Sequence, residues 1–272
     1  MPRLERPAFL LGCGRSGTTI LGRTLAEHGA LHYLNEPRDT WVRAYPRADV
    51  WSARAKRRGG RLVLTATDAV WWRTSRLVRL FATSVAEAGR TRLLEKLPVN
   101  AFRVPFLRAL FPDALFVHLV RNGIEVARSI ERECEVRPWY GVDDYKWQQL
   151  EGVARTDPSL APLLVHCRSS HERGLLEWRL AVEAAIRATD DLPSHQHLAV
   201  RYEDLLDDPV ATIRDIEDFL GLQHDGATSA HAQRNIARRS APAEALAVTD
   251  DATLIAGPLL ARLGYSRPAP PP

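Results

Sequence analysis

A glycine-rich segment near the start of the chain has the residue types needed to bind an anion. The run Gly-Cys-Gly-Arg-Ser-Gly-Thr-Thr occupies residues 12–19, directly after the apolar stretch Phe9–Leu11. Where such a loop joins a strand to a helix, glycines let the backbone approach a ligand, and the free amides surround phosphate or sulfate oxygens. The backbone amides and the three hydroxyls of this loop predict an anion site formed by Arg15, Ser16, Gly17, Thr18 and Thr19.

The same segment departs from the loop that binds nucleoside triphosphates, which reads GxxxxGK[ST]. Gly12 and Gly17 have the right spacing, but Thr18 stands where the lysine should be. The apolar run Leu115–Val120 leads into Arg-Asn and not into a magnesium-binding aspartate. Because lysine and magnesium neutralise a triphosphate, their absence argues against a kinase-like P-loop enzyme. The alternatives to the anion site predicted for this loop are the kinase-like P-loop enzyme and a glycine-rich turn that binds no ligand.

A second pair of polar residues is expected to reach the same place. Arg121 follows a predicted strand, and Ser129 lies about two turns into the helix that comes next. At the carboxyl end of a parallel sheet both side chains can converge on one phosphate beside the first loop. The structural alternative for Arg121 is a helix cap or an ion pair with Glu125.

Together these motifs resemble the sulfotransferases that use 3′-phosphoadenosine 5′-phosphosulfate (PAPS). Residues 14–19 are similar to the phosphosulfate loop of the tyrosylprotein and bacterial carbohydrate types, which carry arginine at this position. The block with Arg121 and Ser129 is similar to the 3′-phosphate site, and Val200–Leu205 resembles a late block from which Tyr202 can contact the nucleotide. The resemblance implies PAPS as co-substrate, adenosine 3′,5′-bisphosphate (PAP) as product, no metal, and a hydroxyl-bearing acceptor such as a small molecule, glycan or phenol.

The resemblance also implies the catalytic groups. Glu36, which Pro37 biases toward an extended backbone, matches the glutamate that removes the acceptor proton. Lys96 is similar to the strand-end lysine of the tyrosylprotein branch. Together with Arg15 it is expected to stabilise charge as the sulfonate moves. Asp39 and a histidine are the alternatives to Glu36 as the base, and a nucleotide-binding protein without catalysis is a further alternative.

The elements that must position these residues alternate between strands and helices. This alternation predicts an α/β, three-layer P-loop-like fold with a central parallel sheet flanked by helices. Strands are expected at Phe9–Leu11, Arg92–Glu95, Leu115–Val120 and Leu198–Tyr202, with Leu62–Thr65 as a weaker candidate. Helices are expected at Thr18–His28, Trp71–Ala88, Glu172–Thr189 and Pro209–Leu220.

Composition excludes several classes of protein. With 272 residues, 45% of them apolar and 26% charged, the chain is neither collagen, coiled coil nor disordered. No apolar run approaches the roughly 20 residues that span a bilayer, and the start has no room for a leader, so we expect a cytoplasmic protein. A net charge of +4 is too small to predict nucleic-acid binding. Cys13, Cys134 and Cys167 are far apart, so neither a disulfide framework nor a metal site is expected.

Residues 1–266 are predicted to form a single sulfotransferase domain and 267–272 a flexible tail. Within the domain, 41–90 is interpreted as an acceptor-side insertion because its aromatic residues are interleaved with arginines. Its basic cluster at 54–61 is interpreted as a solvated loop, with an anion patch as the alternative. The segment Gln223–Ser240 is a weaker candidate for a cover over the nucleotide.

Overall fold

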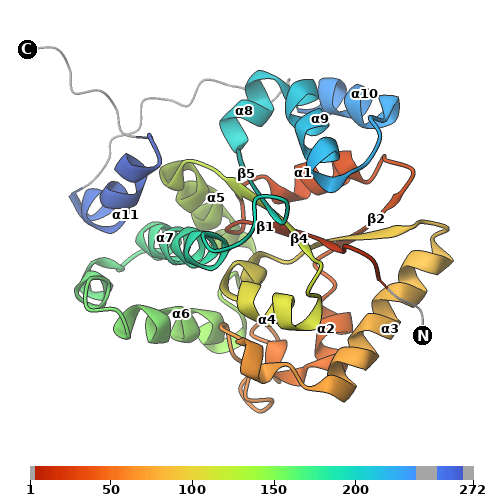
Figure 1. Ribbon diagram of the computed structural model, residues 1–272. Helices are drawn as coiled ribbons and strands as arrows, with labels where there is room; N and C mark the ends of the chain where they lie inside the picture. Colours follow the sequence, from red (N-terminus) through yellow and green to blue (C-terminus); the bar gives the residue numbers. More distant parts are fainter. Residues whose placement is uncertain (1–3, 237–249, 266–272) are drawn as a thin grey trace, which may run out of the picture.

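Five parallel strands form the centre of the computed structural model, which describes residues 4–236 and 250–265 (Figure 1). The strand order is β2-β3-β1-β4-β5. Their bounds are Ala8–Leu11 (β1), Leu31–Asn35 (β2), Arg92–Lys96 (β3), Leu115–Val120 (β4) and His197–Arg201 (β5). The predicted α/β fold with a parallel sheet between helices is confirmed. Because all strands are parallel, their carboxyl ends meet at one edge.

Helices connect the strands and cover both faces of the sheet. The α-helices are α1 (Thr18–Leu25), α2 (Arg38–Ala44), α3 (Trp71–Glu87), α4 (Val104–Leu110), α5 (Gly123–Val136), α6 (Tyr145–Arg155), α7 (Ser170–Thr189), α8 (Tyr202–Asp207), α9 (Pro209–Leu220), α10 (Gly226–Asn235) and α11 (Asp250–Arg262). Short 3-10 helices cover Pro46–Ala48, Ala66–Asp68, Pro98–Phe102, Val142–Asp144 and Ala161–His166.

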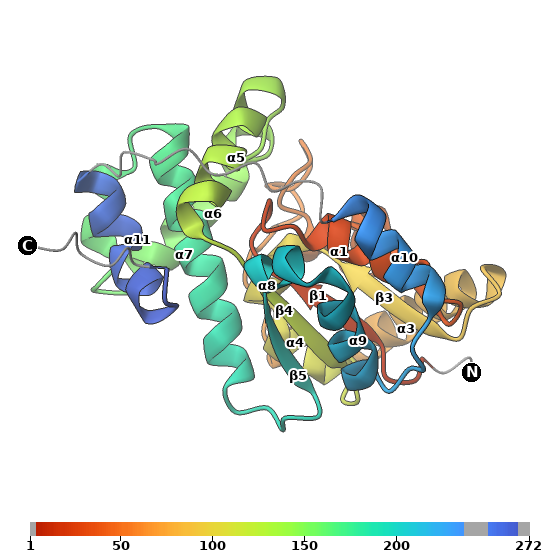
Figure 2. The ribbon, with the colours of Figure 1, turned by 90° about the horizontal axis from the view of Figure 1, so that it is seen from above.

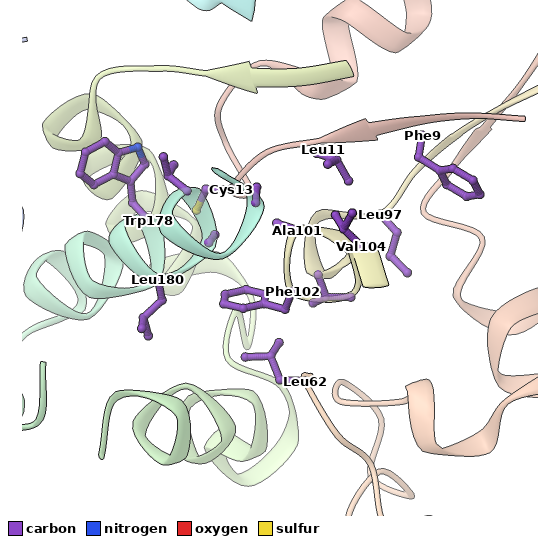
Figure 3. Close-up of a cluster of buried hydrophobic side chains, with 14 of the residues drawn as sticks. Phe9, Leu11, Cys13, Leu62, Leu97, Ala101, Phe102, Val104, Trp178 and Leu180 are labelled. Atoms are coloured by element: carbon purple, nitrogen blue, oxygen red, sulfur yellow. The ribbon is translucent and has the colours of Figure 1, made fainter. Parts of the chain in front are cut away.

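Two buried apolar clusters hold these layers together. Along β1 the side chains alternate, so that Ala8 and Leu10 belong to the cluster under α1, α8, α9 and α10, and Phe9 and Leu11 to the other. Figure 2 shows the first group of helices lying together over the sheet. Figure 3 shows part of the larger cluster, in which Phe9, Leu11 and Trp178 from α7 lie on one side of the sheet. Burial on both faces explains why β1 and β4 read as continuous apolar runs.

One edge strand of the sheet differs from the sequence prediction. Leu62–Thr65, the weaker strand candidate, is not a strand, and Leu31–Asn35 forms the edge strand β2. Leu62 and Leu64 are buried, which produces the alternation of a strand. The backbone of this segment is instead bound by side chains, since the Arg103 guanidinium donates to the carbonyls of Arg61 and Leu62. The predicted helices are confirmed, with the first ending at Leu25 and not at His28.

A buried polar cluster lies behind β3. The carboxylate oxygens of Glu95 accept hydrogen bonds from Trp41 Nε1 and Asn100 Nδ2, both at 2.8 Å. Glu95 is fully buried, and burial raises its pKa from 4.5 to about 8 despite these donors and the nearby Lys96 ammonium. The side chain next to the candidate catalytic Lys96 is therefore mostly a neutral acid near pH 7.

This shift makes the stability depend on pH. A carboxyl group whose pKa is raised by folding contributes its full stability below pH 4.5 and loses it as the pH rises through 8. We expect the unfolding free energy of the wild type to fall by at most about 1.4 kcal/mol per pH unit across this window. Glu95→Gln should flatten that slope, measured by urea denaturation, while the exposed control Glu27→Gln should leave it unchanged. Equal slopes for wild type and Glu95→Gln would contradict the assignment.

Candidate active site

The sequence-predicted residues gather in one cleft of about 580 Å³ at the carboxyl edge of the sheet. Arg15, Gly17, Thr18, Thr19, Glu36, Lys96, Arg121, Ser129 and Tyr202 all line it. Ser16, the remaining predicted residue, is fully buried within the loop and is not among the lining residues. The tertiary structure therefore brings together residues that lie as much as 187 positions apart in the sequence.

The glycine-rich loop has the shape of an anion cradle. Arg15 and Gly17 both have a positive φ, of 73° and 94°, and the Ser16 amide donates to the Cys13 carbonyl at 3.2 Å. Gly17 caps α1, whose first-turn amides have no acceptor within the helix and face the cleft end of the loop. The buried Ser16 hydroxyl has no hydrogen-bond partner among the described residues. These donors fit an oxyanion group.

Tyr202 and Arg121 pack against this loop. A Cβ on Gly17 would lie 2.4 Å from the Tyr202 ring, so the ring rests directly on the glycine. The Arg121 guanidinium lies 4.4 Å from the centre of that ring and donates to the Arg15 carbonyl at 3.3 Å. Arg121 also forms an ion pair with Glu125 at 2.7 Å, the alternative foreseen from the sequence. Arg121 therefore pairs with a residue of α5 and lines the cleft at the same time.

Arg15 ties the loop to α5. Its Nε donates to the Ser129 hydroxyl at 3.0 Å, and its Nη1 lies 2.9 Å from a Glu133 carboxylate oxygen. Glu133 in turn pairs with Arg137 at 2.5 Å. The two predicted anion sites thus share a direct hydrogen bond between side chains.

The candidate base is part of an ion triplet. Glu36 Oε1 accepts from Lys96 Nζ at 2.8 Å, and Glu36 Oε2 accepts from Arg38 at 2.6 Å. Burial raises the pKa of Glu36, but the charges and hydrogen bonds of these two cations outweigh burial and hold it below its ordinary value. Burial lowers the pKa of the Lys96 ammonium, against the opposing effect of Glu36. The carboxylate is therefore ionised at neutral pH and able to accept a proton.

The backbone of Glu36 contradicts the sequence prediction. We expected an extended residue before Pro37, but Glu36 has a positive φ of 53°. Its amide donates to the Lys96 carbonyl at 2.7 Å, and its carbonyl accepts from the Arg38 amide at 2.7 Å. The second bond closes an inverse γ-turn with Pro37 at its centre, φ −74° and ψ 59°. Pairing with β3 and this turn override the local preference, and they aim the carboxylate at Lys96.

Several cleft residues were missed from the sequence. α1 and α10 contribute Arg23, His231, Arg234 and Asn235, and the loop after α5 contributes Arg137 and Trp139. His231, Arg234 and Asn235 belong to the segment Gln223–Ser240, which the sequence marked as a weaker candidate, whereas Arg238 and Arg239 of that segment lie outside the described residues. No local motif distinguishes Arg23, Arg137 and Trp139, because an isolated arginine or tryptophan has no sequence signal.

Trp139 is held against the loop by a buried ion pair. A Cβ on Gly14 would lie 2.7 Å from its ring, so the indole covers the loop backbone there. Its Nε1 donates to Glu177 Oε2 at 2.8 Å, and the other oxygen of Glu177 accepts from Lys146 Nζ at 2.5 Å. Both ion-pair partners are buried, and the ammonium also lies 4.6 Å from the indole centre. This network fixes one wall of the cleft.

The aromatic residues of the 41–90 region have different environments. Trp41 and Tyr45 are buried in the core, whereas Trp71 and Trp72 are exposed on α3. Trp51 is half-buried and stacks under the Arg38 guanidinium at 4.6 Å, beside the ion triplet. The interpretation of these five aromatic residues as an acceptor wall therefore fails for Trp41 and Tyr45, because both side chains pack in the hydrophobic core.

His118 and His166 are not among the residues that line the cleft. His118 is buried in β4, where burial lowers its pKa to about 3, and His166 bonds to Asp251 at 2.7 Å. Across residues 4–236 and 250–265, no three His, Cys, Asp or Glu side chains gather as a metal site would require. Nor does any helix in this part of the chain have the length and apolar character to cross a membrane.

Comparison with known proteins identifies the family. Residues 7–226, about four-fifths of the chain, match the model of the sulfotransferase family. The chain belongs to the sulfotransferase family. As a sulfotransferase it carries the glycine-rich loop, Glu36, Lys96 and Arg121 inside the matched region. The predicted family is confirmed.

Individual relatives of this sulfotransferase chain are distant. The nodulation protein NoeE of Sinorhizobium fredii is 30% identical over 134 residues, 45% of this chain and 30% of that protein. Human carbohydrate sulfotransferase 2 is 31% identical over 105 residues, 38% of this chain and 18% of that protein. The matches thus span less than a third of these relatives' lengths.

Solved structures share the fold of this sulfotransferase. The sulfotransferase domain of the Synechococcus PCC 7002 olefin synthase superposes with a TM-score of 0.57 at 20% identity, covering 98% of each chain. The sulfotransferase domain from the curacin biosynthetic pathway gives 0.57 at 14% identity, covering 98% of this chain and 100% of that one. The predicted fold is confirmed along nearly the whole chain.

The contact between Gly17 and Tyr202 yields a prediction. In Gly17→Ala the new Cβ meets the Tyr202 ring at 2.4 Å and sits at a positive φ, so the loop must distort. We expect PAP affinity, measured by calorimetry, to fall by at least about tenfold, since loop amides would be misplaced. Gly89→Ala is the matched control, because Gly89 also has a positive φ but open space around it. Gly89→Ala should lose about 1 kcal/mol of stability and Gly17→Ala at least as much. A PAP affinity of Gly17→Ala equal to that of the wild type would refute a binding role for the loop.

Proposed function

We propose that this chain transfers a sulfuryl group from PAPS to an acceptor hydroxyl, with Glu36 as the general base. The observation that carries the proposal is the Glu36–Lys96 ion pair, which lines the same cleft as the glycine-rich loop. Membership of the sulfotransferase family supports the reaction class. The carboxylate, the cation and the anion cradle are the three groups that such a transfer needs.

The donor is assigned to the part of the cleft between α1 and α5. The loop amides and the hydroxyls of Ser16, Thr18 and Thr19 would bind the 5′-phosphosulfate. Arg121 and Ser129 would bind the 3′-phosphate, which requires Ser129 to share its hydroxyl with Arg15. Tyr202 would contact the nucleotide from the start of α8, where it lines the cleft beside Arg121. Arg23 and Arg234, which line the same cleft, add positive charge for a bisphosphate.

The residues divide the chemistry among them. The acceptor oxygen forms a bond to sulfur while the bond from sulfur to the bridging oxygen of the 5′-phosphate breaks. Glu36 takes the proton of the acceptor hydroxyl as its oxygen attacks. Arg15 and Lys96 stabilise the charge that passes from the sulfonate to the bridging oxygen, and the loop amides hold the departing phosphate. The lowered pKa of Lys96 suits a group that shares a proton with the leaving oxygen.

The structure bears on the two alternative functions and on the two alternative bases. Thr18 at the lysine position disfavours the kinase, and the intact Glu36–Lys96 pair disfavours a protein without catalysis. His231, which lines the cleft and contacts Thr24 at 3.0 Å, is the histidine best placed to replace Glu36 as base. Asp39 lies in the first turn of α2 and is not among the residues that line the cleft.

The acceptor class and the location of the protein are part of the proposal. The acceptor would approach where Glu36, Pro98 and Trp139 line the cleft, and a hydroxyl-bearing small molecule, glycan or phenol fits that mouth. Trp51, stacked on Arg38, extends the aromatic surface next to Glu36. A cytoplasmic location, a single domain over 1–266 and the tail at 267–272 stay predictions.

Nucleotide selectivity tests the donor. We expect PAP to raise the melting temperature more than ATP with magnesium does, since a ligand that binds the folded state stabilises it by mass action. Adenosine 5′-phosphate, which lacks the 3′-phosphate, should protect less than PAP. The measurement is a thermal melt at equal ligand concentrations. Equal or stronger protection by MgATP would favour the kinase.

Turnover of a Glu36 variant tests the base. Glu36→Gln keeps the size of the side chain but cannot take a proton, so PAP affinity should hold while kcat falls by about 10²- to 10⁴-fold. Asp39→Asn is the matched control and should be nearly silent. Sulfate transfer is measured from PAPS to whichever acceptor proves active, beside donor binding by calorimetry. Turnover within about threefold of wild type would move the base to His231, testable by His231→Gln.

A further inference from the structure

Positive charge is concentrated in one segment beyond the cleft. Residues 43–79, here called the basic surface, contain ten arginines and lysines against two aspartates, a formal net charge of +8. The whole chain carries +4, so all its other residues together carry −4. Asp49 pairs with Arg58, and Asp68 pairs with Arg61. The other eight cations have no ion pair with a described carboxylate, so their charge is available to a ligand.

Exposed tryptophans lie within this charge. Trp71 is 79% exposed and Trp72 is 46% exposed, both in the first turn of α3. Arg76 and Arg79 follow on the same helix, are exposed, and line a hollow of about 280 Å³ with the two indoles. Large aromatic side chains cost free energy when water surrounds them, and an exposed pair of this kind marks an interaction surface.

Three further arginines of the basic surface adjoin this end of α3. A second hollow, of about 370 Å³, is lined by Arg47, Arg58 and Arg73 together with Val70, the residue before Trp71. Arg73 also donates to the Ala44 carbonyl at 3.0 Å, which joins the end of α2 to α3. α2 and α3 lie on the opposite side of the molecule from α8, α9 and α10 (Figure 1). Five arginines of the basic surface therefore lie in the same region as the two indoles.

We propose that the basic surface binds the face of a bilayer that contains anionic lipids. Tryptophan prefers the boundary between headgroups and hydrocarbon, and long arginine side chains can reach phosphates from there. Each cation near an anionic leaflet adds about 1 kcal/mol of attraction. Cations spread over many residues suit a fluid array of headgroups, each of which can move to its own arginine. The association is peripheral, with Trp71 and Trp72 entering the interface.

The geometry disfavours single-stranded nucleic acid as the occupant. Such a strand binds by stacking bases on open aromatic faces. The Arg73 guanidinium lies 4.5 Å from the centre of the Trp72 ring and occupies one of its faces. Insertion into headgroups leaves this stack intact, whereas a nucleobase on that face would have to displace the arginine. The proposal does not depend on sulfuryl transfer, because the surface and the cleft have no residue in common.

Vesicle sedimentation of the full chain tests this proposal. Wild type should bind vesicles of phosphatidylcholine with about one-third phosphatidylglycerol, bind pure phosphatidylcholine weakly, and dissociate in about 0.5 M salt. Arg76→Gln/Arg79→Gln should weaken binding by about thirtyfold, as two lost charges of about 1 kcal/mol each imply. Trp71→Ser/Trp72→Ser should weaken it by at least about tenfold and abolish the blue shift of tryptophan emission that we expect for the wild type on vesicles.

The controls separate this site from general charge. Arg155→Gln/Arg187→Gln removes two arginines outside the basic surface, whose side chains are 63% and 62% exposed. This double variant should leave vesicle binding unchanged. All variants should melt at the wild-type temperature, since none of the four target residues is buried. Binding that ignores phosphatidylglycerol, or equal binding by wild type and both test variants, would overturn the proposal. So would tighter binding to a single-stranded oligonucleotide than to the vesicles.

Discussion

The hydrogen bond from the Glu36 amide to the Lys96 carbonyl depends on the parallel register of β2 and β3. In that register Asn35 lies opposite Lys96, so both strands end together. β1 is aligned with β3 in the same way, with Leu10 opposite Lys96, and the glycine-rich loop begins two residues later. Parallel pairing therefore places a carboxylate, an ammonium and an anion cradle at one edge. A shift by one residue would turn Lys96 to the other face of the sheet.

Charge pairing then fixes the side chains within this frame. Glu36 is held between Lys96 and Arg38, and Arg15 between Ser129 and Glu133. Lys96, Arg15 and Arg121 thus have acceptors before any ligand binds, which preorganises them at a cost in ligand affinity. The same rule applies on the far wall, where the Lys146–Glu177 pair orients Trp139. A buried pair of this kind is weak evidence of stability and better evidence of positioning.

Helix α2 connects the cleft to the proposed membrane surface. α2 begins two residues after Glu36 and ends at Ala44, whose carbonyl is bound by Arg73 of the basic surface. At 1.5 Å per residue this seven-residue helix is about 10 Å long. If both proposals hold, an acceptor at a lipid headgroup would lie near the candidate base. The two can still be tested separately, since one is read from vesicles and the other from turnover.

The sequence by itself determined the sheet strands with continuous apolar runs, the loop, and Arg121, because each is a local pattern with its own physical cause. It also indicated Glu36 and Lys96, although only through resemblance, since a lone Glu-Pro or strand-end lysine has no distinctive chemistry. Tertiary structure alone decided the edge strand β2, whose mixed sequence becomes a strand only when β3 pairs with it. It also decided that Trp41 is core and Trp71 is surface, and that Trp139 lines the cleft. Those outcomes depend on contacts between residues far apart in the chain, and no local pattern encodes such contacts.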